Sequence, residues 1–253
     1  TFNYLRGSYY FYVKVTSFMS NKSSKNREFN HFSKIAKEWW LPNGKFKILH
    51  EITPLRIKYI LKMINQKKIK DLKILDLGCG GGLTCEPLAR LKAKVTGIDF
   101  VQQNIEVAKN HAIISKLKIN YIHDDLDSLK IKKKFDIILL LEILEHLDNW
   151  KSTIPKIKNI LKPEGLLIIS SINKTSLSKI FAIFLAENIL KWVPKNTHDY
   201  DKFITPNELS EILCENNFNV LDTTGINYNP LSKQWKLNKN IYPINYFSTA
   251  KLS

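Results

Sequence analysis

The sequence predicts one α/β domain in which helices cover both faces of a mostly parallel sheet. From residue 73 onward, short and continuously apolar segments alternate with helical patterns, which is typical of parallel strands joined by helices. A glycine-rich run directly follows the first apolar segment, as in sheets that bind ligands at the carboxyl ends of their strands. The chain has 253 residues, 44% hydrophobic and 25% charged, which is enough for one sizeable core and argues against disorder. We therefore expect residues 29–253 to form a single domain.

The N-terminal residues 1–28 are expected to lie outside this domain, as a disordered or non-native tail. Residues 1–18 are aromatic and irregular, and they precede Met19 and a polar stretch. We interpret them as upstream sequence carried into the chain. A targeting peptide is the alternative, but the arginine-rich amphipathic helix and the cleavage pattern of such peptides are missing.

Helical patterns precede the sheet and then alternate with its strands. Apolar residues recur at helical spacing from about 29 to 67, around a turn at 42–44, and Pro54 is expected at a helix start. Further helices are expected over residues 83–91, 101–117, 150–161 and 206–216. Seven strands are expected over residues 73–77, 94–98, 120–123, 136–141, 166–171, 218–224 and 246–252. The last two strands are expected to form a C-terminal antiparallel hairpin, so that the sheet is seven-stranded and mostly parallel.

Residues 174–201 interrupt this alternation and are expected to form an insertion. Its apolar helix, at 175–192, is too apolar for an ordinary exposed helix and too short to cross a bilayer. Lysines near its ends suit an element that lies in the membrane interface. A lid over the active site and a core helix are the alternatives.

The glycine run after the first strand is the clearest functional signal. Gly78, Gly80 and Gly82 follow a G-x-G-x-G pattern, and Leu83 stands where a dinucleotide-binding loop has its third glycine. This favours a nucleoside-containing ligand without a pyrophosphate, with backbone N–H groups facing it. Asp99 ends the second strand, where a carboxylate can accept both ribose hydroxyls. A tight turn and a helix N-cap are the alternative roles of the loop and of Asp99.

A cluster of titratable residues follows the fourth strand. Glu142, Glu145 and His146 have i, i+3 and i+4 spacing, which would place them on one face of a helical turn. Two carboxylates and an imidazole can bind a divalent cation such as magnesium. The alternative is that the residues cap a helix, or that His146 acts as a general base.

Several segments of the chain carry a family resemblance. The stretch ILDLGCGGGLTCEPLARLKAKVTGID resembles the class I S-adenosylmethionine-dependent methyltransferases, which have a Rossmann-like fold. The segments EWWLPNGKFKILHEITPLRIKYI, EILEHL, ENILKWVPKNTHDYDKFI, GINYNPLSKQWKL and INYF are similar to those of the ubiquinone-biosynthesis O-methyltransferases.

The resemblance implies a reaction, a cofactor and a set of site residues. The reaction is methyl transfer from S-adenosylmethionine to a hydroxyl of a polyprenylated catechol or demethylubiquinol. The matching positions imply cofactor contacts at Arg56, Gly78, Asp99 and Leu141. They also imply a metal at Glu142, Glu145 and His146, for which Mg²⁺ is the expected ion. The substrate's polyprenyl tail implies a peripheral membrane enzyme, and a quinone-biosynthesis complex is an implied partner.

The formal net charge of +16 suggests an anionic partner, but nearly all the basic residues are lysines. Arginine, which nucleic-acid grooves favour, occurs only at positions 6, 27, 56 and 90. The Asn/Asp-Pro-Pro-aromatic motif of base methylation is missing after the fourth strand, so no nucleic-acid partner is expected. A nucleic-acid methyltransferase and a non-catalytic S-adenosylmethionine-binding module are the alternatives.

The three cysteines are scattered, which indicates a reducing compartment. The expected location is cytoplasmic, at the inner membrane of a bacterium, because no presequence is recognised. The matrix side of the mitochondrial inner membrane is the alternative.

Overall fold

The computed structural model describes residues 29–30, 32–64, 69–126, 131–180, 200–229, 232 and 234–253. The predicted tail at 1–28 lies outside the described residues, as does 181–199, which holds most of the predicted insertion.

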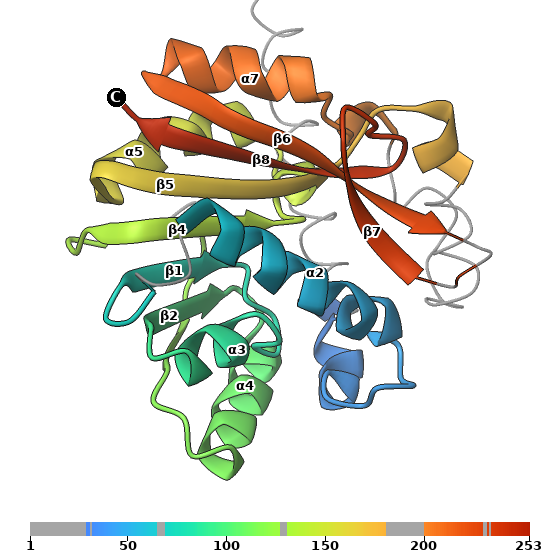
Figure 1. The fold of residues 1–253 in the computed structure, drawn as a ribbon. Helices are drawn as coiled ribbons and strands as arrows, with labels where there is room; N and C mark the ends of the chain where they lie inside the picture. Colours follow the sequence, from blue (N-terminus) through green and yellow to red (C-terminus); the bar gives the residue numbers. More distant parts are fainter. Residues whose placement is uncertain are drawn as a thin grey trace, which may run out of the picture.

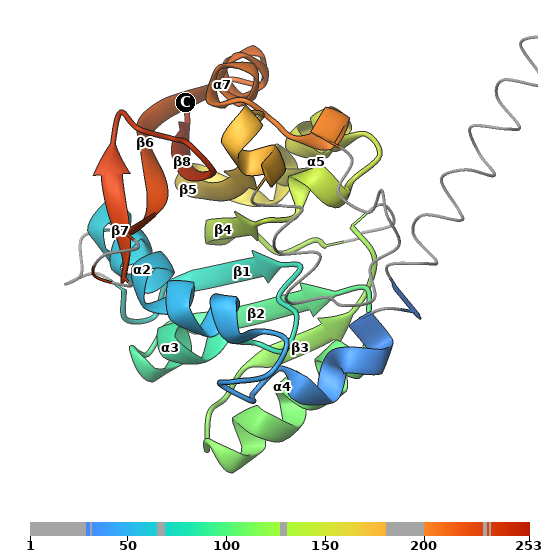
Figure 2. The ribbon, with the colours of Figure 1, turned by 90° about the vertical axis from the view of Figure 1, so that its right-hand side faces the viewer.

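One eight-stranded sheet forms the centre of the molecule (Figure 1), in the order β3-β2-β1-β4-β5-β8-β6-β7. The first five strands are β1 (Lys73–Leu77), β2 (Lys94–Asp99), β3 (Asn120–His123), β4 (Phe135–Leu141) and β5 (Leu161–Ile172). They pair in parallel, so their carboxyl ends meet at one edge, to which the arrowheads of β1, β2 and β3 point in Figure 2. The last three, β6 (Phe218–Asn229), β7 (Gln234–Lys239) and β8 (Asn245–Leu252), are antiparallel.

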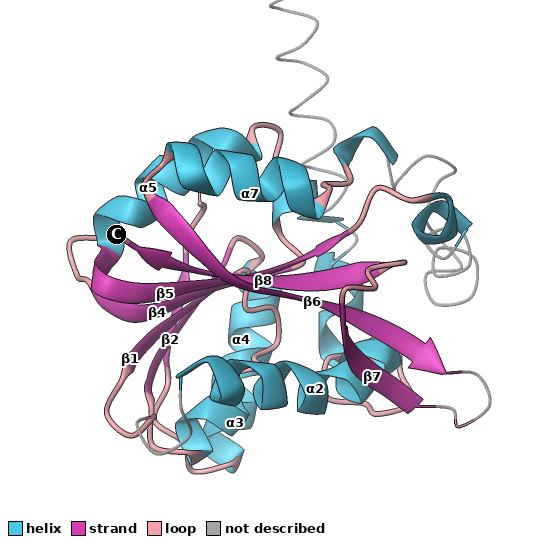
Figure 3. Ribbon diagram, turned by 45° about the horizontal axis from the view of Figure 1, so that its top comes forward, coloured by secondary structure: helices cyan, strands magenta, loops and turns pink. Residues whose placement is uncertain are grey.

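Helices cover both faces of the sheet, as Figure 3 shows. One face carries α2 (Lys47–Ile64), α3 (Cys85–Arg90) and α4 (Gln102–Ile114), and the other carries α5 (Thr153–Ile160) and α7 (Pro206–Glu215). The short helical turns are η1 (Ala36–Glu38), η3 (Leu144–His146), η4 (Trp150–Ser152) and η5 (Tyr200–Lys202).

The residues of β4 explain why this sheet has two covered faces. Ile137 and Leu139 pack in the cluster under α2, α3 and α4, whereas Ile138 and Leu140 pack in the cluster under α5 and α7. Successive strand side chains point to opposite faces, so a strand without polar alternation has to be buried on both sides. The predicted α/β class is confirmed.

The sheet has one strand more than the seven predicted. The added strand, β7, pairs with β6 at the edge, while β6 and β8 form the expected antiparallel pair. In β7 the partly buried Trp235 and Leu237 pack against the core and alternate with polar residues. This alternation, typical of a half-buried edge strand, is the signal that the sequence prediction missed.

Pro54 lies inside α2 rather than at its start, so that prediction is wrong. The helix begins at Lys47, whose N–H donates to the Gly44 carbonyl of the preceding turn. An internal proline costs about 3 kcal/mol. The buried face of α2 continues on both sides of Pro54, through Ile52 and Tyr59, and this burial outweighs the cost.

Candidate active site

The glycine loop leaves β1 at the carboxyl edge of the sheet and lies under the N-terminal segment. Gly80 has a φ of +52°, and a Cβ there would lie 2.4 Å from the Trp39 ring. A side chain at position 80 would therefore be strained and would clash with the tryptophan. Gly82, with a φ of +87°, packs against the Tyr121 hydroxyl behind the loop and does not line the cavity described below.

The N–H groups of the loop are bonded within the protein, which differs from the expectation that they face a ligand. Those of Gly78 and Cys79 both donate to the Ile98 carbonyl, at 2.7 and 2.9 Å, and that of Gly80 donates to Asp99 Oδ2 at 2.8 Å. The loop therefore allows close approach to its backbone rather than offering these donors to an anion. That property agrees with a ligand that has no pyrophosphate.

Asp99 ends β2 and is almost completely buried. Besides the Gly80 N–H, it accepts bonds at Oδ1 from the Val101 N–H at 2.9 Å and from Asn104 Nδ2 at 3.2 Å. Burial raises the pKa of Asp99, and these hydrogen bonds oppose the rise. Asp99 thus holds the start of α4 through the Val101 N–H, although the N-cap residue itself is Val101.

One cavity of about 240 Å³ opens beside the loop and gathers most of the predicted site residues. Those that line it are Arg56, Gly78, Gly80, Asp99, Leu141, Glu142 and His146. Gly82 and Glu145 are not among the residues that line it.

The cavity also contains residues that sequence reasoning missed. Asp124 and Asp125 follow β3 directly, and they line the cavity with Trp39 and Asn104. The two aspartates had a usable signal, because they follow a parallel strand at the same edge as Asp99. Trp39 stands in a segment that carries the family resemblance, but no local pattern predicted that it would reach this cavity from the N-terminal segment.

Arg56 and Glu142 form a buried ion pair in the cavity wall. Arg56 Nη2 lies 2.8 Å from Glu142 Oε2, and their side chains are 6% and 20% exposed. Asn245 Nδ2 donates to the other carboxylate oxygen at 3.3 Å. Arg56 Nε has no hydrogen-bond partner within the described part of the chain. This buried N–H is available to a polar ligand.

Glu142, Glu145 and His146 do not share one helical face, so that expectation is wrong. Glu142 has a left-handed φ of +58°, and its N–H donates to the Ser170 carbonyl, which extends the ladder between β4 and β5. Only Leu144–His146 form the turn η3. His146 therefore lines the cavity, while Glu145 is buried beneath it.

Glu145 is a buried carboxyl with one oxygen satisfied. Its Oε2 accepts from Ser171 Oγ at 3.2 Å, and its Oε1 has no partner among the described residues. Burial raises the pKa of Glu145 to about 7; His146 opposes the rise and the Glu142 carboxylate adds to it.

Asp76, the last residue but one of β1, is buried in the cavity wall and interacts electrostatically with Arg56 and Asp99. Its Oδ2 accepts from Cys85 Sγ at 3.2 Å. Burial raises the pKa of Asp76 to about 6, and both the Cys85 bond and the charge of Arg56 oppose the rise.

The described residues contain neither a metal-ligand cluster nor a membrane-spanning helix. No group of three or more His, Cys, Asp or Glu side chains in this part of the chain is gathered as a metal site. No helix of the same residues combines the length and apolar character needed to cross a membrane.

The sequence matches known methyltransferases over most of its length. Residues 48–223 match the model of a methyltransferase domain. A ubiquinone biosynthesis O-methyltransferase of Pelagibacter ubique is 47% identical over 234 residues, covering 89% of this chain and 97% of the relative. One from Rickettsia felis is 40% identical over 227 residues, covering 89% and 93%.

Solved structures share the fold at lower identity. Magnesium protoporphyrin IX methyltransferase from Synechocystis is 19% identical with a TM-score of 0.61, covering 79% of this chain and 83% of that one. An S-adenosylmethionine-dependent methyltransferase from Clostridium acetobutylicum is 17% identical with a TM-score of 0.58, covering 89% and 99%. The Rossmann-like methyltransferase fold is therefore confirmed.

Proposed function

The chain belongs to the ubiquinone biosynthesis O-methyltransferase family, and we propose that it methylates a ring hydroxyl of a polyprenylated catechol and of demethylubiquinol, with S-adenosylmethionine as the methyl donor. The observation that carries this proposal is the single cavity that joins the glycine loop and Asp99 to Arg56, Glu142 and His146. It offers a nucleoside site and an acid–base group within one cavity.

We assign the cofactor to the β1–β2 side of this cavity. Asp99 receives the ribose hydroxyls, and the backbone of Gly78, Gly80 and Leu141 permits close approach. Arg56 receives the methionine carboxylate, and its unpartnered Nε supports this role because a buried guanidinium N–H needs an acceptor. Gly82 contributes by packing the loop against Tyr121.

The chemical step is an in-line transfer. The acceptor oxygen attacks the methyl carbon, the carbon–sulfur bond breaks with its electron pair remaining on sulfur, and the sulfonium charge is lost. The hydroxyl proton has to leave during this step, and His146 in the cavity wall is the group that we assign to accept it. The cavity wall aligns the two reactants.

We also propose Glu142, Glu145 and His146 as the residues that would hold Mg²⁺. Oxygen and imidazole donors suit this ion, and Glu145 Oε1 has no partner among the described residues. The three side chains are not gathered as a metal site in the described structure, so binding would have to draw Glu145 toward the cavity. A bound cation would lower the pKa of the acceptor hydroxyl. It would have to compete with Arg56, which holds Glu142 in an ion pair.

The apolar insertion at 174–201 supports a peripheral position on the membrane that holds the substrate's tail. At its described start, Leu177 and Ile180 are 58% and 64% exposed. Lys174 and Lys179 both lie over the Tyr200 ring, 5.4 Å from its centroid. We place the enzyme on the cytoplasmic side of a bacterial inner membrane, within reach of other quinone-biosynthesis enzymes; the mitochondrial matrix side is the alternative. Flotation with anionic vesicles, and not with neutral ones, is expected.

The experiment that tests the reaction is methyl transfer from labelled S-adenosylmethionine to a short-chain polyprenyl-catechol, with and without chelator. His146→Ala and the Glu142→Ala, Glu145→Ala double variant are measured beside it. Turnover that chelator abolishes and magnesium restores supports both the reaction and the metal ligands. If chelator does not change turnover but His146→Ala lowers it, His146 acts as the base without a metal. Cofactor binding without turnover on catechol or quinol would overturn the proposed reaction and favour the non-catalytic module.

A further inference from the structure

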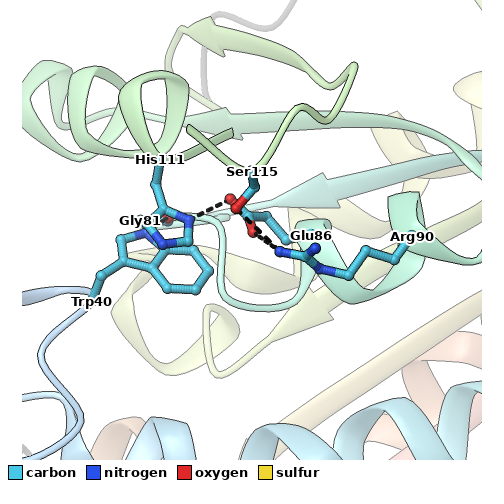
Figure 4. Close-up of polar contacts among 6 residues, drawn as sticks. All are labelled: Trp40, Gly81, Glu86, Arg90, His111 and Ser115. Atoms are coloured by element: carbon cyan, nitrogen blue, oxygen red, sulfur yellow. Dashed lines mark hydrogen bonds and ion pairs between the residues drawn. The ribbon is translucent and has the colours of Figure 1, made fainter. Parts of the chain in front are cut away.

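The outer side of the glycine loop is held by a tryptophan that the proposed chemistry does not use (Figure 4). Trp40 Nε1 donates to the Gly81 carbonyl at 2.9 Å, across 41 positions of sequence. Trp40 is not among the residues that line the cavity. Its contact with the site therefore runs through the loop backbone alone.

A stacked histidine holds the indole in place. The rings of Trp40 and His111 are 3.4 Å apart between centroids and inclined by 3°. His111 Nδ1 lies 2.6 Å from Glu86 Oε1. A carboxylate only accepts, so Nδ1 carries the proton of this bond, and the bond sets the orientation of the ring. The position of the Trp40 indole thus depends on α4.

Glu86 is the buried carboxylate that orients His111. It belongs to α3, directly after the loop, and is 1% exposed. Its second oxygen accepts from Arg90 Nη2 at 3.0 Å, and Arg90 also donates to Ser115 Oγ at 3.1 Å. A buried carboxylate without its partners is strongly destabilising, so Glu86 does not release His111 easily.

The glycine loop is conformationally free and is stabilised by contacts with neighbouring side chains. Gly80 and Gly82 have left-handed φ values, and glycine has more backbone freedom to lose than any other residue. Trp39 packs against Gly80 and Gly81, and Trp40 holds the Gly81 carbonyl. The two consecutive tryptophans of the N-terminal segment therefore both contact the loop, one by packing and the other by a hydrogen bond.

We propose that Trp40, held by His111 and Glu86, is a positioning residue for S-adenosylmethionine binding. It keeps the loop in the conformation in which the Gly80 N–H reaches Asp99 and the backbone of Gly78 and Gly80 lines the cavity. The inference rests on the proposed function, because it assumes that this loop binds the cofactor.

Trp40→Phe tests the proposal, because it keeps an aromatic ring for His111 and removes only the N–H donor. We expect the Kd for S-adenosylmethionine, measured by calorimetry, to rise about five- to tenfold, the usual effect of one lost hydrogen bond. Turnover at saturating cofactor should stay within about twofold. Trp235→Phe is the matched control, because its indole donates to Glu51 at 3.1 Å and is not among the cavity-lining residues. It should leave the Kd unchanged.

A second variant keeps the test decisive if Trp40→Phe lowers the unfolding temperature. His111→Gln removes the stacked ring but keeps an amide donor for Glu86, and it should raise the Kd about threefold. An unchanged Kd in both variants, or a fall in saturated turnover at unchanged Kd, would overturn the inference. Wild-type protein that binds no S-adenosylmethionine would instead overturn the proposed function.

Discussion

The two sides of the cavity are built differently. On the cofactor side, at the ends of β1 and β2, Asp99 accepts three hydrogen bonds and the loop N–H groups are paired. On the acceptor side, around the ends of β4 and β5, three buried polar atoms have no partner within the described residues. They are Glu145 Oε1, Ser170 Oγ and Asn245 Oδ1. On the proposed cofactor side, the exceptions are the Tyr121 hydroxyl and Arg56 Nε, which is assigned to the cofactor's carboxylate.

This difference indicates which side is formed in advance. A fully paired polar network is rigid. In a partly paired network, each buried polar group without a partner has a free-energy cost, which is relieved when a ligand forms the missing hydrogen bond. We therefore expect changes on the cofactor side to cost both stability and cofactor affinity. Changes on the acceptor side should cost activity more than stability.

The largest effect is expected from Asp99→Ala, which leaves three buried donors unpaired and removes the proposed ribose acceptor. Each unpaired donor costs about 1–3 kcal/mol, and the affinity for S-adenosylmethionine should fall at least about 100-fold. Chemical denaturation and calorimetry measure the two effects. Asp136→Ala is the matched control, because that carboxylate accepts from the Lys73 N–H at the opposite edge of the sheet. An equal loss of affinity in the control would remove Asp99 from the cofactor site.

A pH-dependent effect is expected from Asp76, which lines the cavity and interacts electrostatically with both Arg56 and Asp99. Burial raises its pKa to about 6 from an ordinary 3.8, so the native protein binds more protons than the unfolded chain between these values. The stability therefore falls as the pH rises from about 4 to about 6, by about 3 kcal/mol from this group. Urea unfolding should show that Asp76→Asn is more stable than the wild type above pH 7 and equal to it below about pH 4. A constant difference between the two across this range would contradict the assignment.

The Arg56–Glu142 pair joins the two sides of the cavity, and a smaller effect is expected from it. Removing either partner leaves a buried charge, so each single alanine variant should lose stability, while the double variant should lose less than the sum. The expected coupling is about 1–3 kcal/mol from a double-mutant cycle of unfolding free energies. Additive losses would mean that the two side chains do not interact in solution.

The smallest change in stability is expected from Glu145→Gln. It replaces a buried carboxyl that has one unpartnered oxygen with a neutral amide, so the unfolding free energy should stay within about 1 kcal/mol of wild type or rise. Turnover should nevertheless fall at least about tenfold if Glu145 serves the acceptor side. Unaltered turnover would leave Glu145 a purely structural residue and break the comparison at that position.

The sequence was a reliable guide to the glycine loop and to the end of β2 for a local reason. Glycine turns, an acid at a strand end and apolar strands are all recognisable from neighbouring residues. This is why the sequence predicted that Gly78, Gly80 and Asp99 lie at the same edge of the sheet. The position of Pro54 and the existence of β7 were predicted wrongly because both depend on tertiary burial. The buried face of α2 continues past Pro54. Trp235 packs against the core only when β7 pairs with β6.

What the sequence by itself determined is the strand–helix alternation, the glycine loop and the edge of the sheet at which the site lies, since periodicity and glycine act over neighbouring residues. Only the tertiary structure decided that Arg56 pairs with Glu142, that Glu145 is buried while His146 lines the cavity, and that Trp40 holds Gly81. These contacts join residues from separate elements, or depend on one left-handed residue at Glu142. Their energies come from burial and pairing across space, which no local pattern of residues records.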